Sequence, residues 1–108
     1  MLRFNLKKKW FDKIKSGEKT HEYREVKPYW TKRFCNELYV NADELKHYQE
    51  YNDKAIVFIK GYSNKVDDKL LARLYSIKVR NGKNTDLGID KDVYDIEFEL
   101  VRYNFERN

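Results

Sequence analysis

Residues 17–24 read Gly-Glu-Lys-Thr-His-Glu-Tyr-Arg, and this stretch connects a predicted helix with a predicted strand. Upstream, apolar residues recur over residues 7–16 at the spacing of a short amphipathic helix. Gly17 is the predicted end of that helix, because glycine takes the left-handed conformation at a helix C-terminus at little cost. Residues 20–26 are rich in β-forming side chains and predict an extended strand. The stretch therefore gathers several charged side chains at a helix–strand junction.

Alternate side chains of an extended strand share one face, so Glu22 and Arg24 are expected to point the same way. The turn at Gly17 swings Lys19 toward them, which predicts a carboxylate lying between two cations. His21 is expected on the opposite face of the strand, where we interpret it as a partly buried and hydrogen-bonded histidine.

The periodicity of the remaining chain predicts an α+β fold of about five strands with short helices. Pro28 ends the strand that contains the motif, because proline cannot donate to a sheet. Helical turns are predicted near residues 29–34 and again at residues 44–51. A polar loop is expected from residue 81 to about residue 92. The other strands are predicted at residues 2–6, 55–59, 70–79 and 94–100, with 55–59 central and Glu97 and Glu99 facing solvent.

Length and composition indicate a single domain spanning residues 1–108. Cys35 has no internal partner for a disulfide, and the chain has only two histidines, so we expect neither a metal nor a cofactor. No apolar run approaches the length that spans a bilayer, and the N-terminus lacks the continuous apolar segment of a signal peptide. These features predict a cytoplasmic protein with no membrane partner.

The net charge of +5 is concentrated in the N-terminal third of the chain. Residues 1–34 hold eleven Lys and Arg residues against four acids, whereas residues 35–108 carry a small excess of acids. One interpretation is a lysine-rich helix face that is simply solvated. We favour an electrostatic footprint for phosphate groups, because the basic excess surrounds the motif.

The pattern Gly17-x-Lys19-x-x-Glu22-x-Arg24 resembles the G-x-K-x-x-E-x-R signature of the ASCH family, within the PUA-like superfamily. The resemblance covers roughly the whole chain. It implies a small PUA-like curved β-barrel of about five strands, with short flanking helices and a cleft between a helix and the barrel. The flanking segments that carry the resemblance are residues 7–16, Lys27-Pro28-Tyr29-Trp30, Arg33 and Gly61-Tyr62.

The resemblance and the charge distribution together predict binding of RNA, or of a free nucleotide or nucleoside. In a cleft, Lys19 would face a phosphate or a base carbonyl. Glu22 would accept a hydrogen bond from an exocyclic amine, and Arg24 would fork onto phosphate or stack on a base. The alternative interpretation of Glu22 and Arg24 is an ordinary ion pair, but exposed pairs contribute little to stability.

Aromatic side chains beside cations are typical of single-stranded nucleic-acid sites. Tyr23 and Trp30 would offer stacking surfaces to bases, and Arg33 lies three residues from Trp30 in the sequence. The alternative place for both rings is the hydrophobic core, which is the usual location of aromatic residues.

A second function class is a small hydrolase acting on a modified pyrimidine nucleoside or on RNA. Some ASCH relatives are amidohydrolases that remove an acyl group from a modified cytidine, and others have been linked to RNA cleavage. The amidohydrolases resemble G-x-K-x-x-T-x-R, with a catalytic lysine and threonine. In this sequence Glu22 stands in place of that threonine. Lys19 and Glu22 would then handle the proton, and Thr20 is the nearest hydroxyl. A third class is a protein-interaction domain without ligand chemistry.

Overall fold

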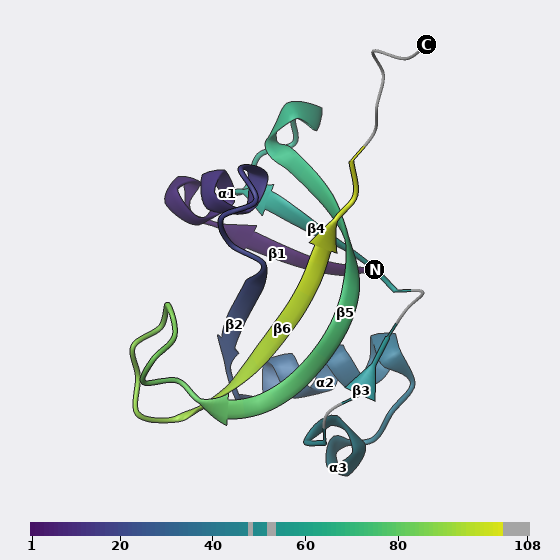
Figure 1. Cartoon of the computed structure of the whole chain (residues 1–108). Coiled ribbons are helices and arrows are strands. Elements are labelled where there is room, and N and C mark those ends of the chain that lie inside the picture. The colour runs from purple at the N-terminus through teal and green to yellow at the C-terminus, as the bar shows by residue number, and fades with distance from the viewer. Residues whose placement is uncertain (48, 52–53, 103–108) are drawn as a thin grey trace.

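The computed structural model describes residues 1–47, 49–51 and 54–102, and it shows a strongly curled β-sheet with helices beside it (Figure 1). The helices are α1 (Lys8–Lys15), α2 (Pro28–Leu38) and α3 (Ala42–Leu45), with a 3-10 turn η1 (Val66–Asp68). The strands are β1 (Leu2–Leu6), β2 (His21–Glu25), β3 (Gln49–Glu50), β4 (Ala55–Lys60), β5 (Lys69–Asn81) and β6 (Asp92–Leu100).

The sheet runs in the order β1-β4-β5-β6-β2, and the short β3 pairs with β5. The β1–β4 pair is parallel and the other pairs are antiparallel. An irregularity between Leu74 and Ser76 shifts the register of β5 against β6, as expected where a long strand bends. Among the described residues, no backbone pairing joins the two edge strands β1 and β2. The expected curved sheet is therefore present as a half-barrel with an open seam between β1 and β2.

The elements on either side of residues 17–24 form as their sequence predicts. Helix α1 buries Phe11 and Ile14 on one face and leaves its lysine-rich face in solvent. Gly17 follows it with a φ of 87°, in the left-handed region that glycine adopts without steric cost. Strand β2 then runs along β6, and the backbone amide of Lys19 donates to the carbonyl of Lys13 at 3.0 Å, which fixes the turn.

The segment between β2 and β4 differs from its prediction in two respects. Helix α2 is a full eleven residues long, because Pro28 suits the first turn of a helix and Tyr39, at φ 56°, terminates it. The helix predicted at residues 44–51 is wrong. A capping box between Asn41 and Glu44 starts α3 earlier, and residues 49–50 pair with the edge of β5 instead. Tyr48, which falls within that prediction, lies outside the described residues.

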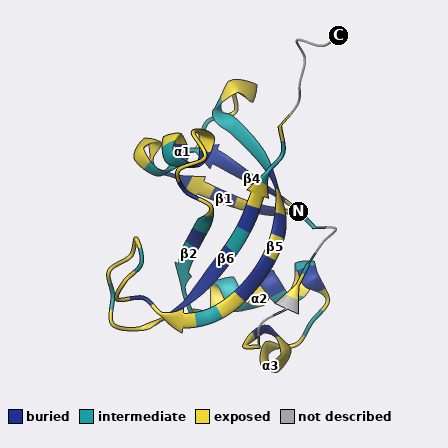
Figure 2. Ribbon diagram, viewed as in Figure 1, coloured by how far each residue is buried: buried dark blue, intermediate teal, exposed yellow. Residues whose placement is uncertain are grey.

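The core lies inside the curl of the sheet, where α2 packs against the inner faces of the strands. Phe4 is fully buried at its centre and stacks on Trp30 at 5.2 Å and on Phe58 at 5.7 Å between ring centroids. Phe34 of α2 meets Tyr94 of β6 edge-on at 4.9 Å. Figure 2 shows buried residues along β4, β5 and β6, while the loop between β5 and β6 is largely exposed.

In the part of the chain that the structure describes, none of the helices has the length and apolar character needed to cross a lipid bilayer.

Replacing Phe4 by alanine tests the importance of this aromatic core. The truncation leaves a cavity among three ring systems, and we expect it to lower the free energy of unfolding by ~3–5 kcal/mol. Val66→Ala is the control, because Val66 is 85% exposed and its truncation leaves no cavity. Urea unfolding followed by fluorescence measures both. A loss for Phe4→Ala as small as that for Val66→Ala would contradict this description of the core.

Candidate functional site

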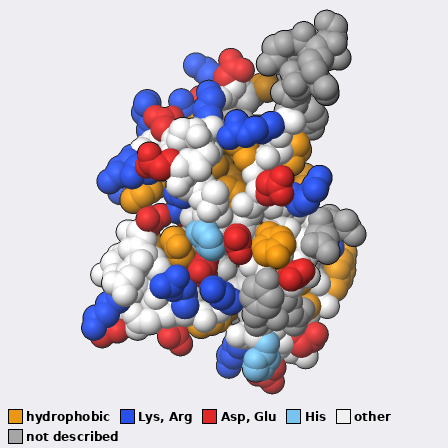
Figure 3. All heavy atoms as spheres, viewed as in Figure 1, with side chains coloured by type: hydrophobic (Ala, Val, Ile, Leu, Met, Phe, Trp, Pro, Cys, Tyr) orange, Lys and Arg blue, Asp and Glu red, His pale blue; other side chains and the backbone are white. Residues whose placement is uncertain are grey.

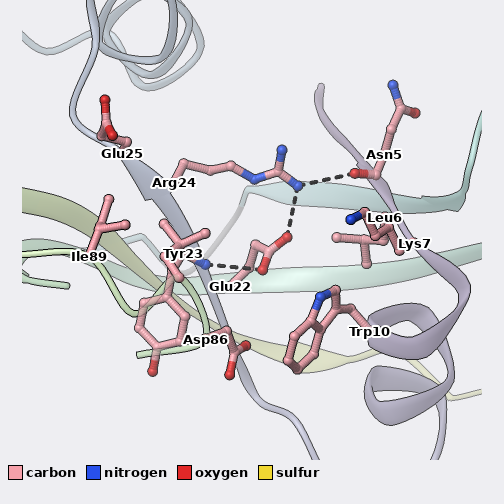
Figure 4. A pocket seen from close by; sticks show the side chains of 11 residues that line it. Asn5, Leu6, Lys7, Trp10, Glu22, Tyr23, Arg24, Glu25, Asp86 and Ile89 are labelled. Carbon is pink, nitrogen blue, oxygen red and sulfur yellow. Dashed lines mark hydrogen bonds and ion pairs between the residues drawn. The ribbon is translucent and has the colours of Figure 1, made fainter. Parts of the chain in front are cut away.

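The main concavity around the motif lies at the open seam of the sheet. We call it the seam cleft; its volume is about 520 Å³. It lies between residues 5–7, at the end of β1 and just beyond it, and residues 22–25 of β2, and Trp10 of α1 forms one wall (Figure 4). The loop between β5 and β6 covers it with Asp86, Leu87 and Ile89. The helix before Gly17 thus contributes one wall, and Glu22 and Arg24 line the same hollow.

Glu22 is the buried centre of the cleft, with an exposure of only 6%. Its Oε1 lies 3.3 Å from Lys19 Nζ and accepts the backbone N–H of Tyr23 at 3.1 Å. Its Oε2 accepts from Arg24 Nη2 at 2.8 Å. A buried carboxylate is costly unless it is paired and hydrogen-bonded. The two cations that the sequence predicted around Glu22 meet this requirement.

Lys19 is nearly as buried, at 8%, and it has a second acidic partner. Its Nζ contacts Oδ2 of Asp86, which reaches the cleft from the loop between β5 and β6. The same ammonium lies 5.4 Å from the centroid of the Trp10 ring and 5.1 Å from that of Tyr23. Two carboxylates and two ring faces therefore hold Lys19 in place.

Arg24 joins the two edge strands across the seam. Its Nη2 donates to the backbone carbonyl of Asn5 at 3.2 Å in addition to Glu22, as Figure 4 shows. Its guanidinium lies 5.1 Å from the centroid of the Phe4 ring and 5.0 Å from that of Trp30. This side chain thus replaces part of the backbone pairing that a closed barrel would have there.

The opposite face of β2 carries a second polar cluster. His21 Nδ1 lies 2.6 Å from Oδ1 of Asp95, and Arg80 approaches the other oxygen of that carboxylate at 3.6 Å. Glu97 lies 3.8 Å from His21 Nε2, and the Tyr23 ring stacks on the imidazole at 6.2 Å. The prediction of a partly buried, hydrogen-bonded His21 facing away from Glu22 is confirmed.

Asp95 is the buried acid of β6, the strand on which Glu97 and Glu99 were predicted to face solvent. It is 2% exposed, whereas Glu99 is exposed as predicted. The cause is tertiary, because the ion pairs to His21 and Arg80 come from two different strands and compensate the buried charge. Figure 3 shows acidic and basic side chains interspersed over the face of the molecule in that view, so the net positive charge does not form a continuous basic surface there.

Thr20 lies just before β2 and is exposed. It lines a neighbouring hollow of about 250 Å³ together with Lys19, His21 and Asp86, and it is not among the residues that line the seam cleft. Its backbone carbonyl accepts from the amide of Phe98 at 3.1 Å. The hydroxyl of Thr20 therefore does not share the hollow of Glu22.

Trp30 and Arg33 do not line the seam cleft either. Trp30 is half-buried against Phe4 and against Phe34, the latter at 5.7 Å, so one of its sides belongs to the core. Arg33 lies 5.5 Å from the centroid of the Trp30 ring, and both residues line a third hollow that Arg24 shares. The predicted site residues are thus distributed over three hollows.

Several residues of the site were not predicted from the sequence, including Trp10, which lines the seam cleft, as well as Asp86, Asp95 and Asn5. Asp86 lies in a loop more than sixty residues from Lys19 in sequence, and nothing in the local pattern distinguishes it from its acidic neighbours. Asp95 belongs to the alternating pattern of the last strand, and nothing in that pattern separates it from Glu97 and Glu99, which were predicted to face solvent. Asn5 contributes its backbone carbonyl, which no side-chain pattern can indicate. Among the described residues, no group of three or more His, Cys, Asp and Glu side chains is arranged to hold a metal ion.

Comparison of the chain with protein-family models gives no match, and comparison with curated proteins gives none either. The fold and the site therefore define a small α+β domain with a curled sheet and a charged cleft at its open seam. Membership of the ASCH family stays a prediction based on residues 17–24 and their flanking segments.

The environment of Tyr23 makes a testable prediction about pH. Burial raises the pKa of its phenol above the usual 10.0, and the nearby carboxylate of Asp95 raises it further. The folded state therefore keeps the proton at a pH where the unfolded state has lost it, so stability falls as the pH rises past 10.0. Tyr23→Phe should weaken that fall. In a pH titration followed by tyrosinate absorbance, the part of the signal that the wild-type chain has and the variant lacks should develop above pH 10.0.

Tyr62→Phe is the matched control, because Tyr62 is 89% exposed. If the absorbance removed by Tyr23→Phe and that removed by Tyr62→Phe titrate at the same pH, the described burial of Tyr23 is wrong.

Proposed function

We propose that this chain is a nucleotide- or RNA-binding domain of the ASCH type, with a base bound in the seam cleft. The observation that carries the proposal is the buried Glu22 carboxylate, held between Lys19 and Arg24 at the bottom of an open hollow. An ion pair that served stability alone has no need of a cleft around it, and replacing buried pairs by apolar residues is often neutral or stabilising. Convergent polar groups in a hollow of this size are typical of small-ligand sites.

The cleft suits a flat, partly polar ligand such as a nucleobase. Trp10 and Tyr23 supply ring surfaces, and Leu87 and Ile89 supply apolar ones. A carboxylate has about four lone-pair positions, and three of those on Glu22 are taken by Lys19, Arg24 and the Tyr23 amide. One position therefore remains for an exocyclic amine, which is the group that acidic side chains read on cytosine.

The contacts favour binding over turnover. Glu22 is bonded through both oxygens, and Lys19 is held by two carboxylates. A proton moved from Lys19 would leave those two negative charges with less compensation. A fixed cluster of this kind is suited to holding a ligand in one orientation.

The binding proposal is tested with the four common ribonucleoside monophosphates and a short single-stranded RNA, measured by calorimetry. We expect cytosine, adenine and guanine ligands, each of which carries an exocyclic amine at the base-pairing edge, to bind about tenfold or more better than uracil ligands. Glu22→Gln should weaken that preference, because an amide NH2 group that cannot accept replaces one of the two acceptor oxygens and the negative charge is lost. Glu99→Gln is the matched control on an exposed position.

Equal binding of all four bases by the wild-type chain would remove Glu22 from base recognition. Absence of binding by any nucleotide or RNA at low salt would contradict the proposed function as a whole, because electrostatic contributions are then at their largest.

A second candidate, a hydrolase of a modified pyrimidine nucleoside or RNA, is supported by one observation. Lys19 Nζ of the neighbouring hollow and Glu22 Oε1 of the seam cleft lie 3.3 Å apart, which is the pairing that proton handling by these two residues requires. Incubation with N4-acylated cytidines and with RNA, followed by mass spectrometry, tests it. In this mechanism Glu22→Gln abolishes turnover and Thr20→Ala, in the neighbouring hollow, retains it. The reverse pattern would assign the hydroxyl of Thr20 as the nucleophile, and no product from any substrate would leave the binding function alone.

A further inference from the structure

A separate hollow, about 350 Å³ in volume, adjoins the seam cleft on the far side of Arg24. We call it the arginine hollow, because Arg3, Arg24 and Arg33 line it together with Asn5 and three aromatic residues. We propose that the arginine hollow binds a phosphate group of the same ligand whose base occupies the seam cleft. The ligand class would then be a phosphorylated nucleotide or an RNA phosphodiester, and not a free nucleoside. This inference rests on the proposed function.

The first argument is charge. Among the described residues, no acid lines the arginine hollow, and neither Arg3 nor Arg33 forms an ion pair. Arg24 alone of the three has a carboxylate partner, Glu22, which lies in the seam cleft. Three guanidinium groups that line one hollow with a single carboxylate among their partners leave an excess of positive charge, which attracts an anion.

The second argument is hydrogen bonding. In the described part of the chain, the buried side-chain polar atoms without a hydrogen-bond partner are Nε of Arg24 and Nε of Arg33. Both belong to residues that line the arginine hollow. Buried donors normally have partners, and these two donors have none within the described chain, so they retain hydrogen-bonding capacity for an anion. A phosphate oxygen that draws the guanidinium edge outward would satisfy such a donor, because phosphate matches the fork of arginine donors.

The third argument is preorganisation. Arg33 lies 5.5 Å from the ring centroids of both Tyr29 and Trp30, and its Nη1 donates to the Tyr29 hydroxyl at 3.3 Å. The guanidinium of Arg24 lies against the rings of Phe4 and Trp30 in the aromatic core. Stacked guanidinium groups lose little freedom on binding, so less of the binding free energy is spent on ordering them.

The two hollows differ in charge in a way that matches the two parts of a nucleotide. The seam cleft contains three carboxylates, those of Glu22, Glu25 and Asp86, which repel phosphate but can accept from a base amine. No carboxylate from the described part of the chain lines the arginine hollow. Asn5 and Arg24 line both hollows, so one ligand can reach from one to the other. The base is therefore assigned to the seam cleft and the phosphate to the arginine hollow.

The test compares each nucleoside with its 5′-monophosphate, and both with a short RNA that lacks terminal phosphates, by calorimetry. We expect the wild-type chain to bind the monophosphate or the RNA about 10-fold to 100-fold more tightly than the nucleoside, the range expected of charge-assisted hydrogen bonds. Preference for the monophosphate identifies a terminal phosphate, and preference for the RNA identifies a phosphodiester. Arg3→Gln and Arg33→Gln should each reduce the advantage and leave nucleoside binding unchanged. Arg73→Gln, an exposed arginine on β5, is the control.

A nuclear magnetic resonance titration with inorganic pyrophosphate separates this inference from the proposed function. We expect the Nε–Hε signals of Arg24 and Arg33 to shift in the wild-type chain. Nucleoside and nucleotide binding of equal strength would overturn the phosphate site while leaving the binding function in place. Arginine shifts with pyrophosphate, without binding of any nucleoside or nucleotide, would keep the anion site and overturn the nucleotide as its ligand. No binding of any of these probes would overturn both.

Discussion

The buried carboxylate of Glu22 is the constraint on which the arrangement around the seam depends. An acid at 6% exposure requires compensating charge, and that charge comes from Lys19 and Arg24 on the same short stretch. The turn at Gly17 sets the position of Lys19, and the two-residue repeat of β2 sets that of Arg24. The carboxylate thereby determines how α1, β2 and the loop carrying Asp86 meet.

The open seam explains why the cleft lies where it does. Edge strands expose unpaired backbone groups, and proteins usually cover them. Here the edges of β1 and β2 face one another without pairing among the described residues, and Arg24 reaches across to the carbonyl of Asn5. A fully closed barrel would fill this position with a backbone ladder. The half-barrel leaves room for side chains that converge on a ligand.

The two faces of β2 both carry charged and polar side chains, but these side chains have different surroundings on each face. Glu22 and Arg24 face the cleft and the aromatic core, and their charges are arranged so that part of the hydrogen-bonding capacity stays free. His21 faces outward, where the buried Asp95 orients the imidazole, and the Tyr23 ring that stacks on it also lines the seam cleft. Because the strand period is two, each face could be shaped by different neighbours: α1 and the first strand on one side, β5 and β6 on the other.

Local sequence was sufficient for those features that depend on neighbouring residues alone. The helix before Gly17, the shared face of Glu22 and Arg24, and the strand at residues 55–59 follow from periodicity and from the conformations that glycine and proline allow. Tertiary structure alone decided which distant residues compensate the buried charges: Asp86 pairs with Lys19, and Arg80 pairs with Asp95. It also decided that Trp30 and Arg33 lie in a separate hollow, and that residues 49–50 pair with β5 although their sequence suggested a helix. The physical reason is that these features depend on distances in space. A buried charge is compensated by whichever residue lies near it, and a short strand pairs with whichever sheet edge lies beside it, and a pattern along the chain contains neither distance.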